Sequence, residues 1–423
     1  MPQPDASRRS GALVFVYVTV ALDMIALGII APVLPKLIAS MLHGNLANAA
    51  LVTGVFASIW AICQFFCSPL LGMFSDRVGR RPVILISNAV TAIDYAIMAL
   101  APNLWWLFAG RLLSGVATSN MTAAYAYIAD VTPGEKRAAA YGMLASAFGL
   151  GFVIGPAIGG LAGMSDPRLP FWIAAGLSVL NTLYGTFVLR ESLPRELRTK
   201  ALDWKRANPV GSLRLLRRHH ELYGLATVTF VALIAHEAMP TLWVLYLIAQ
   251  FGWDQRAIGL GLALVGVISS LNAALLVGPV VAKLGERRTL VAGLATFALG
   301  CALFASNNVY VAVAGIVVLC LSIYNAPMQS LMTQRVGKSE QGELQGALGS
   351  LRGIAMLIGP LVFAPVFAQF TGPWRSLALQ GAPFYLAAAM LIVALAIALR
   401  VTTRADDAVL PLPEPAPVTM VDV

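Results

Sequence analysis

The sequence at residues 72–82 reads GMFSDRVGRRP and joins two apolar runs, residues 49–73 and 83–101. Each run is close to the ~20 residues of helix that cross a hydrocarbon layer ~30 Å thick. Neither run alternates in the manner of a strand, and a helix satisfies its own backbone hydrogen bonds in lipid. The charged segment is therefore predicted to be a short loop between two membrane-spanning helices.

The same pattern of apolar runs and short polar breaks continues in both directions. Hydrophobic residues make up 58% of the chain and charged residues 12%, and the mean hydropathy is +0.78. A soluble domain carries about a quarter charged residues, so this chain is too apolar to be one. We predict an all-α membrane protein with twelve transmembrane helices, at residues 12–37, 49–73, 83–101, 104–128, 139–163, 170–189, 222–249, 257–281, 290–306, 309–333, 345–369 and 376–399.

The net charge of +9 follows the predicted topology. Of 29 Lys and Arg, 23 lie in the termini and the even-numbered loops, and only Arg168, Arg256 and Arg375 lie in odd-numbered loops. Under the positive-inside rule, this asymmetry places both termini in the cytoplasm. The basic charge therefore reflects topology, and we expect no nucleic-acid partner. Tryptophans beside the odd-numbered loops fit an outer interfacial belt: Trp105, Trp106, Trp172, Trp253 and Trp374.

The two halves of the chain repeat each other. Span five and span eleven share Leu, Ser, Gly and an Ile-Gly-Pro triplet at a constant offset of 204 residues, from Leu144 and Pro156 to Leu348 and Pro360. Two parallel six-helix bundles imply a pseudo-two-fold axis along the membrane normal, with a site between them near the midplane. The predicted parts are a first bundle (1–190), a cytoplasmic linker with an amphipathic helix (191–220), a second bundle (221–400) and a disordered cytoplasmic tail (401–423).

The loop at residues 72–82 resembles the G-x-x-x-D-R-x-G-R-[RK] loop of the major facilitator superfamily, at the same place between spans two and three. Glycine permits close helix approach and a tight turn, and the Asp and Arg charges can latch a cytoplasmic gate. In the second half Ala282 takes the place of the acid, so the latch is asymmetric. The alternative is a loop that is basic only for topology. The gate candidates are Gly72, Asp76, Arg77, Gly79, Arg80 and Arg81.

Span five carries a second motif, which resembles the glycine-rich antiporter motif of drug exporters in this superfamily. Small residues let two helices touch, and a proline bends a helix. The alternative for each glycine is simple helix packing. The motif residues are Gly149, Gly151, Gly155, Pro156, Gly159 and Gly160.

Ionisable residues inside the spans are candidates for proton coupling, because each costs ~2.5–3.5 kcal/mol on insertion scales. They are Asp23, Asp94, Arg111 and Glu237. A carboxyl group inside the bilayer favours its neutral form and can exchange a proton. The alternative is static pairing, of Arg111 with a carboxylate or of Glu237 with Arg352. The candidate substrate pocket is formed by Gln64, Asn120, His236, Trp243, Asn272, Asn325, Gln329 and Arg352.

The chain as a whole resembles the tetracycline efflux pumps, through the segments around Asp23, the 72–82 loop, Asp94, Arg111 and the span-five motif, and through residues 284–288 and 341–346 in the second half. The resemblance implies the twelve-helix facilitator fold, exchange of drug for protons, antibiotic resistance, a bacterial inner membrane, and essential roles for Asp23, Asp76, Asp94 and Arg111. This chain departs from the family at Ser269 and Phe297, where the pumps have a histidine and an aspartate.

We therefore expect a proton-driven exporter of amphipathic small molecules, not an enzyme. The alternatives are a proton-coupled uptake symporter and, from another class, a membrane-embedded enzyme or sensor. The four cysteines lie within spans and suggest no disulfide framework, and no His or Cys spacing suggests a metal site. No phosphate-binding loop is present, so we expect no use of ATP. We also expect no cofactor, and we expect the protein to be a monomer.

Overall fold

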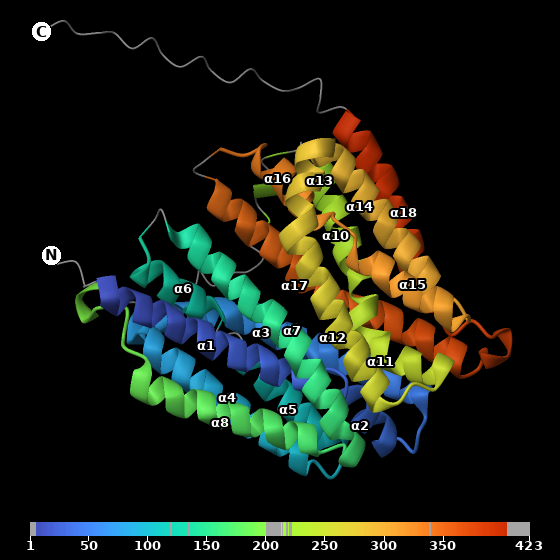
Figure 1. The fold of residues 1–423 in the computed structure, drawn as a ribbon, viewed down its shortest axis with the longest axis horizontal. Helices are drawn as coiled ribbons and strands as arrows, with labels where there is room; N and C mark the ends of the chain where they lie inside the picture. The colour runs from blue at the N-terminus through green and yellow to red at the C-terminus, as the bar shows by residue number, and fades with distance from the viewer. Residues whose placement is uncertain are drawn as a thin grey trace, which may run out of the picture.

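The computed structural model describes residues 6–118, 121–133, 136–199, 213, 215–216, 219, 222–337 and 340–403 (Figure 1). Asn120, the tail after residue 403 and most of the predicted amphipathic helix lie outside the described residues. Throughout the described ranges the regular structure is helical, as the apolar runs predict. The prediction of an all-α membrane fold is confirmed.

Eight helices form the first half. They are α1 (Ala6–Ile30), α2 (Leu34–Met41), α3 (Leu46–Val78), α4 (Arg80–Leu100), α5 (Leu104–Ala117), α6 (Met121–Val131), α7 (Arg137–Ser165) and α8 (Leu169–Val188). The second half contains α10 (Tyr223–His236), α11 (Ala238–Phe251), α12 (Gln255–Leu271), the π-helical turn Asn272–Leu276, α13 (Val277–Leu284), α14 (Glu286–Phe304), α15 (Val309–Cys320), α16 (Asn325–Thr333), α17 (Gln341–Thr371) and α18 (Ala382–Thr403).

Eleven helical segments of the described chain are long and apolar enough to cross a membrane. The helices α5 and α6 together occupy the remaining predicted span, residues 104–128. Each of the twelve predicted spans therefore coincides with one helix or with consecutive helices of the structure.

Several spans that we predicted as continuous helices are interrupted, and that part of the prediction is wrong. The first span breaks between α1 and α2, the seventh at Glu237, and the tenth between Cys320 and Asn325. The eighth contains the π-helical turn after Leu271. A proline or a polar residue stands at each break (Pro32, Glu237, Asn272 and Asn325), but hydropathy averaged over a whole span stays high and does not reveal the break. Non-helical backbone at membrane depth occurs where it is buried in protein or lines a cavity.

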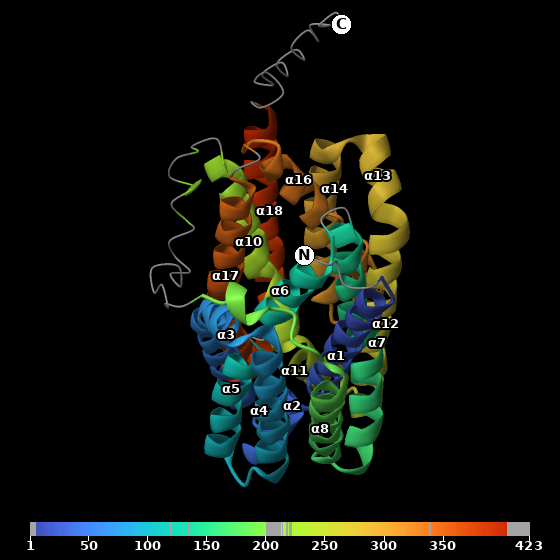
Figure 2. The same ribbon diagram turned by 90° about the vertical axis from the view of Figure 1, so that its left-hand side faces the viewer.

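The two halves meet mainly through two helix pairs, with smaller contacts of α11 against α2 and α3. Figure 2 shows α3 beside α17 and α7 beside α12. A Cβ atom on Gly160 of α7 would lie 2.8 Å from the Cα of Gly259 in α12, and one on Gly54 would lie 2.6 Å from the Cβ of Ala364. At these points the helices are in backbone contact.

The contacts between the halves are confined to one side of the molecule. Along α7 they begin near Gly149, whereas a Cβ on Gly142, nearer the start of the helix, would have no atom within 4 Å. Along α17, a Cβ on Gly353 would contact the other half, whereas one on Gly349 would have no atom within 4 Å. The halves therefore touch on one side and separate on the other, which is the side that carries the 72–82 loop (Figure 1).

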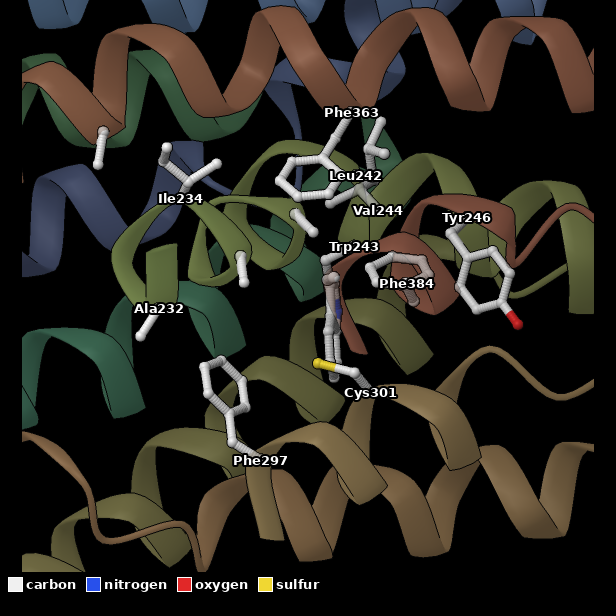
Figure 3. Packing of buried hydrophobic residues seen from close by; sticks show 14 of the residues in the cluster. Ala232, Ile234, Leu242, Trp243, Val244, Tyr246, Phe297, Cys301, Phe363 and Phe384 are labelled. Carbon is white, nitrogen blue, oxygen red and sulfur yellow. The ribbon is translucent and has the colours of Figure 1, made fainter. Parts of the chain in front are cut away.

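Aromatic side chains pack between the helices of the second half. In the second half, Trp243 of α11 stacks on Phe304 of α14 with ring centroids 5.0 Å apart. Tyr246, from the same helix, packs edge-on against Phe384 of α18 at 4.9 Å (Figure 3). Its hydroxyl group donates a hydrogen bond to the carbonyl oxygen of Phe304. Buried aromatic pairs of this kind contribute ~0.5–1.5 kcal/mol each beyond the area that they bury.

Candidate functional site

A cavity of about 860 Å³ lies between the halves. Helices of both bundles contribute to its wall, which is mostly apolar and aromatic. Four of the predicted pocket residues line the cavity: His236, Trp243, Asn272 and Asn325. Arg111 and Gly149, from the other predicted groups, also line it. Gln64, Gln329 and Arg352 are not among its lining residues, and Asn120 lies outside the described part of the chain. Gln329 donates instead to the side chain of Gln345.

The glycines of the span-five motif hold α7 against α1. A Cβ on Gly28 would lie 2.6 Å from the carbonyl oxygen of Gly151, and one on Gly155 would lie 2.6 Å from the Cα of Gly28. A Cβ on Gly159 would overlap the backbone of Ile29. Any side chain at these positions would push the two helices apart, so the motif fixes one wall of the cavity.

The predicted acids of the first half, Asp23 and Asp94, are not among the residues that line the cavity. The side-chain amide of Asn181 in α8 donates to Oδ1 of Asp23 at 2.8 Å and to the carbonyl oxygen of Thr19 at 3.0 Å. Asp94 is fully buried, and its carboxylate lies beside the side chain of Ser114. Arg111 lies close enough to act electrostatically on Asp94. Arg111 therefore connects the buried acid to the cavity.

Glu237 stands at the break between α10 and α11. A Cβ on Gly359 of α17 would lie 2.7 Å from its Cγ, so its side chain packs directly on α17 and is not part of the cavity wall. Within the described ranges no ion pair shorter than 4 Å joins Glu237 to Arg352, although Arg352 acts electrostatically on both Glu237 and His236. His236 itself lies in the cavity wall, 6.0 Å from the ring of Phe297.

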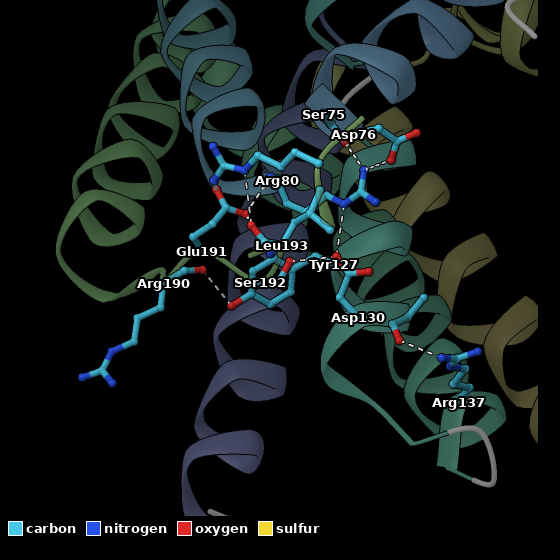
Figure 4. Close-up of polar contacts among 12 residues, drawn as sticks. Ser75, Asp76, Arg80, Tyr127, Asp130, Arg137, Arg190, Glu191, Ser192 and Leu193 are labelled. Atoms are coloured by element: carbon cyan, nitrogen blue, oxygen red, sulfur yellow. Dashed lines mark hydrogen bonds and ion pairs between the residues drawn. The ribbon is translucent and has the colours of Figure 1, made fainter. Parts of the chain in front are cut away.

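Residues 72–82, which we predicted to be a loop, belong to the end of α3 and the start of α4 except for Gly79 between them. This 72–82 loop is organised around one buried cation. Arg80 is 7% exposed and lies at the start of α4. Its Nη1 donates to Ser75 Oγ at 2.6 Å and to the carboxylate of Asp76, and its Nε donates to Asp130 Oδ2 at 3.1 Å (Figure 4). Since a buried charge requires such partners, Arg80 ties together the ends of α3, α4 and α6.

The sequence analysis missed Glu191, which supports this loop from the end of the sixth span. Its Oε1 accepts hydrogen bonds from the backbone N–H groups of Arg80 (2.8 Å) and Leu193 (3.1 Å), and its Oε2 pairs with Arg198 at 3.5 Å. Gly79 has φ +109° and lies so close to this carboxylate that a Cβ would overlap it. An acid directly after an apolar span and beside a basic loop was the available signal.

Glu191→Gln is expected to loosen the loop. The negative charge of Glu191 pairs with Arg198 and stabilises the N-terminus of α4, and the amide has no such charge. We expect the free energy of unfolding to fall by about 1–2 kcal/mol, because the group is partly exposed. We expect a lower melting temperature and slower transport with unchanged substrate affinity. Glu196→Gln, at an exposed acid five residues further on, is the matched control. Equal melting temperatures for the two variants would contradict a supporting role for Glu191.

Two helical bundles around a central cavity at membrane depth define a secondary transporter. The family model of the Major Facilitator Superfamily matches residues 16–272 and 225–420. The chain belongs to this superfamily.

Curated relatives and solved structures agree with this assignment. The chain is 37% identical to the tetracycline resistance protein of class C from Escherichia coli, over 90% of this chain and 96% of the relative. It is 36% identical to the class E protein from the same organism, over 85% and 88%. The crystal structure of a bacterial homologue of the human lysosomal transporter Spinster, inward-facing and unoccupied, covers 96% of this chain and 100% of its own at 16% identity, with a TM-score of 0.76.

Proposed function

We propose that this protein is a proton-coupled antiporter that exports amphipathic small molecules, tetracycline-like compounds or other drugs, by alternating access. The observation that carries the proposal is the cavity of about 860 Å³ between the halves, with Arg111 in its wall and the buried Asp94 directly behind. The high identity to tetracycline resistance proteins over nearly the whole chain supports export as the direction.

In this mechanism Asp23 and Asp94 hold protons, and Arg111 links them to the bound substrate. A buried carboxylate is costly when charged, which favours the protonated acid until a cation approaches. Arg111 can approach Asp94 or face the cavity, so proton and substrate compete for it. The gate residues Asp76 and Arg80 keep the loop side closed in the opposite state.

We propose further that the loop side is cytoplasmic, so that the structure corresponds to a cytoplasm-open state. The distribution of basic residues supports this orientation and two cytoplasmic termini. The bacterial origin of the tetracycline resistance proteins supports an inner-membrane location. We expect the protein to act as a monomer and to use protons rather than ATP.

Everted membrane vesicles test the direction of coupling. A pH gradient that is acidic inside should drive uptake of tetracycline or a fluorescent drug into everted vesicles, and a reversed gradient should not. Accumulation under the reversed gradient would favour the alternative, a proton-coupled uptake symporter.

Glu237 is proposed to contribute to coupling rather than to a static pair with Arg352. We expect Glu237→Gln to remain folded and to lose most export, because the neutral amide cannot release a proton. Glu237→Gln/Arg352→Gln should be as inactive as the single variant, since no ion pair joins the two side chains in the described structure. Recovery of export in the double variant, measured in everted vesicles, would support the static pair.

A further inference from the structure

A second pocket, of about 470 Å³, lies on the loop side of the first half and shares no lining residue with the central cavity. The end of α3, the start of α4 and the segment that follows α8 form its wall. Its charged lining residues are three arginines and one glutamate: Arg81, Arg195, Arg198 and Glu191. Positive charge predominates, and we call this site the basic pocket.

The single acid of the basic pocket balances only part of this charge. Oε2 of Glu191 pairs with Arg198 at 3.5 Å, and Oε1 accepts two backbone N–H groups. One arginine is therefore compensated by the glutamate. Arg81 and Arg195 have no acid as an ion-pair partner within the described chain, so the pocket attracts an anion.

The two uncompensated arginines are held in different ways. Nη2 of Arg81 donates to the carbonyl oxygen of Thr186, near the end of α8, at 2.8 Å, which positions the guanidinium group without neutralising it. Arg195 lies in the short helical turn Arg195–Leu197, and its exposed side chain makes no hydrogen bond within the described chain. The planar fork of N–H donors in arginine matches the oxygens of a phosphate group. Both side chains are therefore suited to one phosphate in the pocket.

The basic pocket stands at the end of an apolar surface. The helices α4 and α8 lie side by side at the outer edge of the first half, away from the second half (Figure 1). Pro82 lines the pocket, and Ile86, Ile93 and Leu100 follow it on the same face of α4, at intervals of four and seven residues. These three side chains are more than half exposed, as is Phe187 of α8. In a membrane such a face contacts acyl chains.

The combination of this face and the basic pocket fits an amphipathic anion. A phospholipid whose acyl chains lie along α4 holds its phosphate group at the level of the arginines, and basic pockets beside membrane-spanning helices bind anionic head groups. A zwitterionic head group brings a cation that the arginines repel. Inorganic phosphate could use the arginines, but it gains nothing from the apolar face.

From this arrangement we propose that the basic pocket binds the head group of an anionic phospholipid, with the acyl chains along the exposed face of α4. The ligand is phosphatidylglycerol or another phospholipid with a net negative charge. Because Glu191 and Arg81 also hold the start of α4 in place, a bound lipid stabilises the 72–82 loop from the membrane side. The proposal depends neither on the transported substrate nor on the direction of transport.

Native mass spectrometry of the full-length protein in detergent tests the preference for a head group. Dioleoyl phosphatidylglycerol and dioleoyl phosphatidylcholine have the same acyl chains and differ in net charge. We expect the first phosphatidylglycerol to bind at least about tenfold more tightly, because each basic side chain near an anionic lipid contributes about fivefold. Equal affinities for the two lipids would overturn the proposal.

The melting temperature separates a lipid from a soluble phosphate. Phosphatidylglycerol added to the detergent solution should raise the melting temperature of the protein, because it binds the folded state. Millimolar inorganic phosphate without lipid should leave it unchanged. An equal rise with inorganic phosphate would show that the pocket takes a soluble anion, and would refute the lipid as its ligand.

Arg195→Gln tests the location. Because the Arg195 side chain is exposed and makes no hydrogen bond within the described chain, the variant should fold and melt as the wild type does. We expect its affinity for the first phosphatidylglycerol to fall by about fivefold and its affinity for phosphatidylcholine to be unchanged. Arg195→Lys retains the charge and should retain most of the affinity.

Arg288→Gln is the matched control, at an exposed arginine in the corresponding loop of the second half, outside the basic pocket. It should alter neither affinity. Equal phosphatidylglycerol affinities for Arg195→Gln and Arg288→Gln would refute the basic pocket as the lipid site. A wild-type protein that binds phosphatidylglycerol as expected but moves no drug in vesicles would refute the proposed antiport and leave the lipid site intact.

Discussion

Asp76→Asn is expected to reduce transport by more than about tenfold while expression and folding are nearly unchanged, equivalent to a barrier at least ~1.4 kcal/mol higher. In this state Asp76 is half-exposed and pairs with Arg80, which keeps Ser75 and Asp130 as partners when Asp76 becomes an amide, so the change should cost little stability. When the loop side closes, the same carboxylate must approach the second half, and the amide provides no charge for that contact. Transport in everted vesicles and the melting temperature are the two measurements.

Two controls accompany this prediction. Asp76→Glu retains the charge and should keep much of the transport, and Asp166→Asn, at an exposed acid on the other side of the membrane, should leave it unchanged. Wild-type transport by Asp76→Asn would refute the latch.

Asp23→Asn is expected to abolish proton-coupled export and to retain substrate binding. The Asn181 amide that donates to Asp23 also donates to the carbonyl oxygen of Thr19, so the site remains tied to α1 when the carboxylate is replaced. An amide at position 23 cannot take up or release a proton. Proton movement on addition of substrate, followed by a pH-sensitive dye, should disappear, whereas Asp23→Glu should preserve part of it. Undiminished proton movement in Asp23→Asn would exclude Asp23 as a carrier.

Hydropathy and charge were sufficient to predict the twelve spans and the helical membrane fold. Each span is a local property of about 20 residues, and lipid leaves no alternative to a helix. The repeat between spans five and eleven was equally visible, because identical residues recur at a constant offset. The interruptions at Glu237, Asn272 and Cys320 were missed, since they depend on contacts with other helices and since one polar residue does not lower the mean hydropathy of a span enough to mark a break.

The candidate site was only partly accessible from the sequence. His236, Trp243, Asn272 and Asn325 line the cavity, as polar or aromatic residues in apolar spans suggested. Gln64 and Gln329 belong to the same residue types at similar depth but face elsewhere, because a residue's position around its helix axis depends on tertiary packing. Glu191 was missed because its role arises from a contact with Arg80, 111 residues earlier in the chain.

The acids Asp23 and Asp94 lie in the first bundle, whereas the interrupted helices around Glu237, Asn272 and Asn325 lie in the second. A change in the second bundle that reshapes the cavity therefore leaves these first-bundle acids untouched. Such a division allows substrate range to evolve while these two acids, and Glu237, stay unchanged. Under selection by a new compound, we expect gain-of-function substitutions to accumulate at residues 238–243, 269–277 and 319–326. An inhibitor directed at the first-bundle acids would be correspondingly harder to evade.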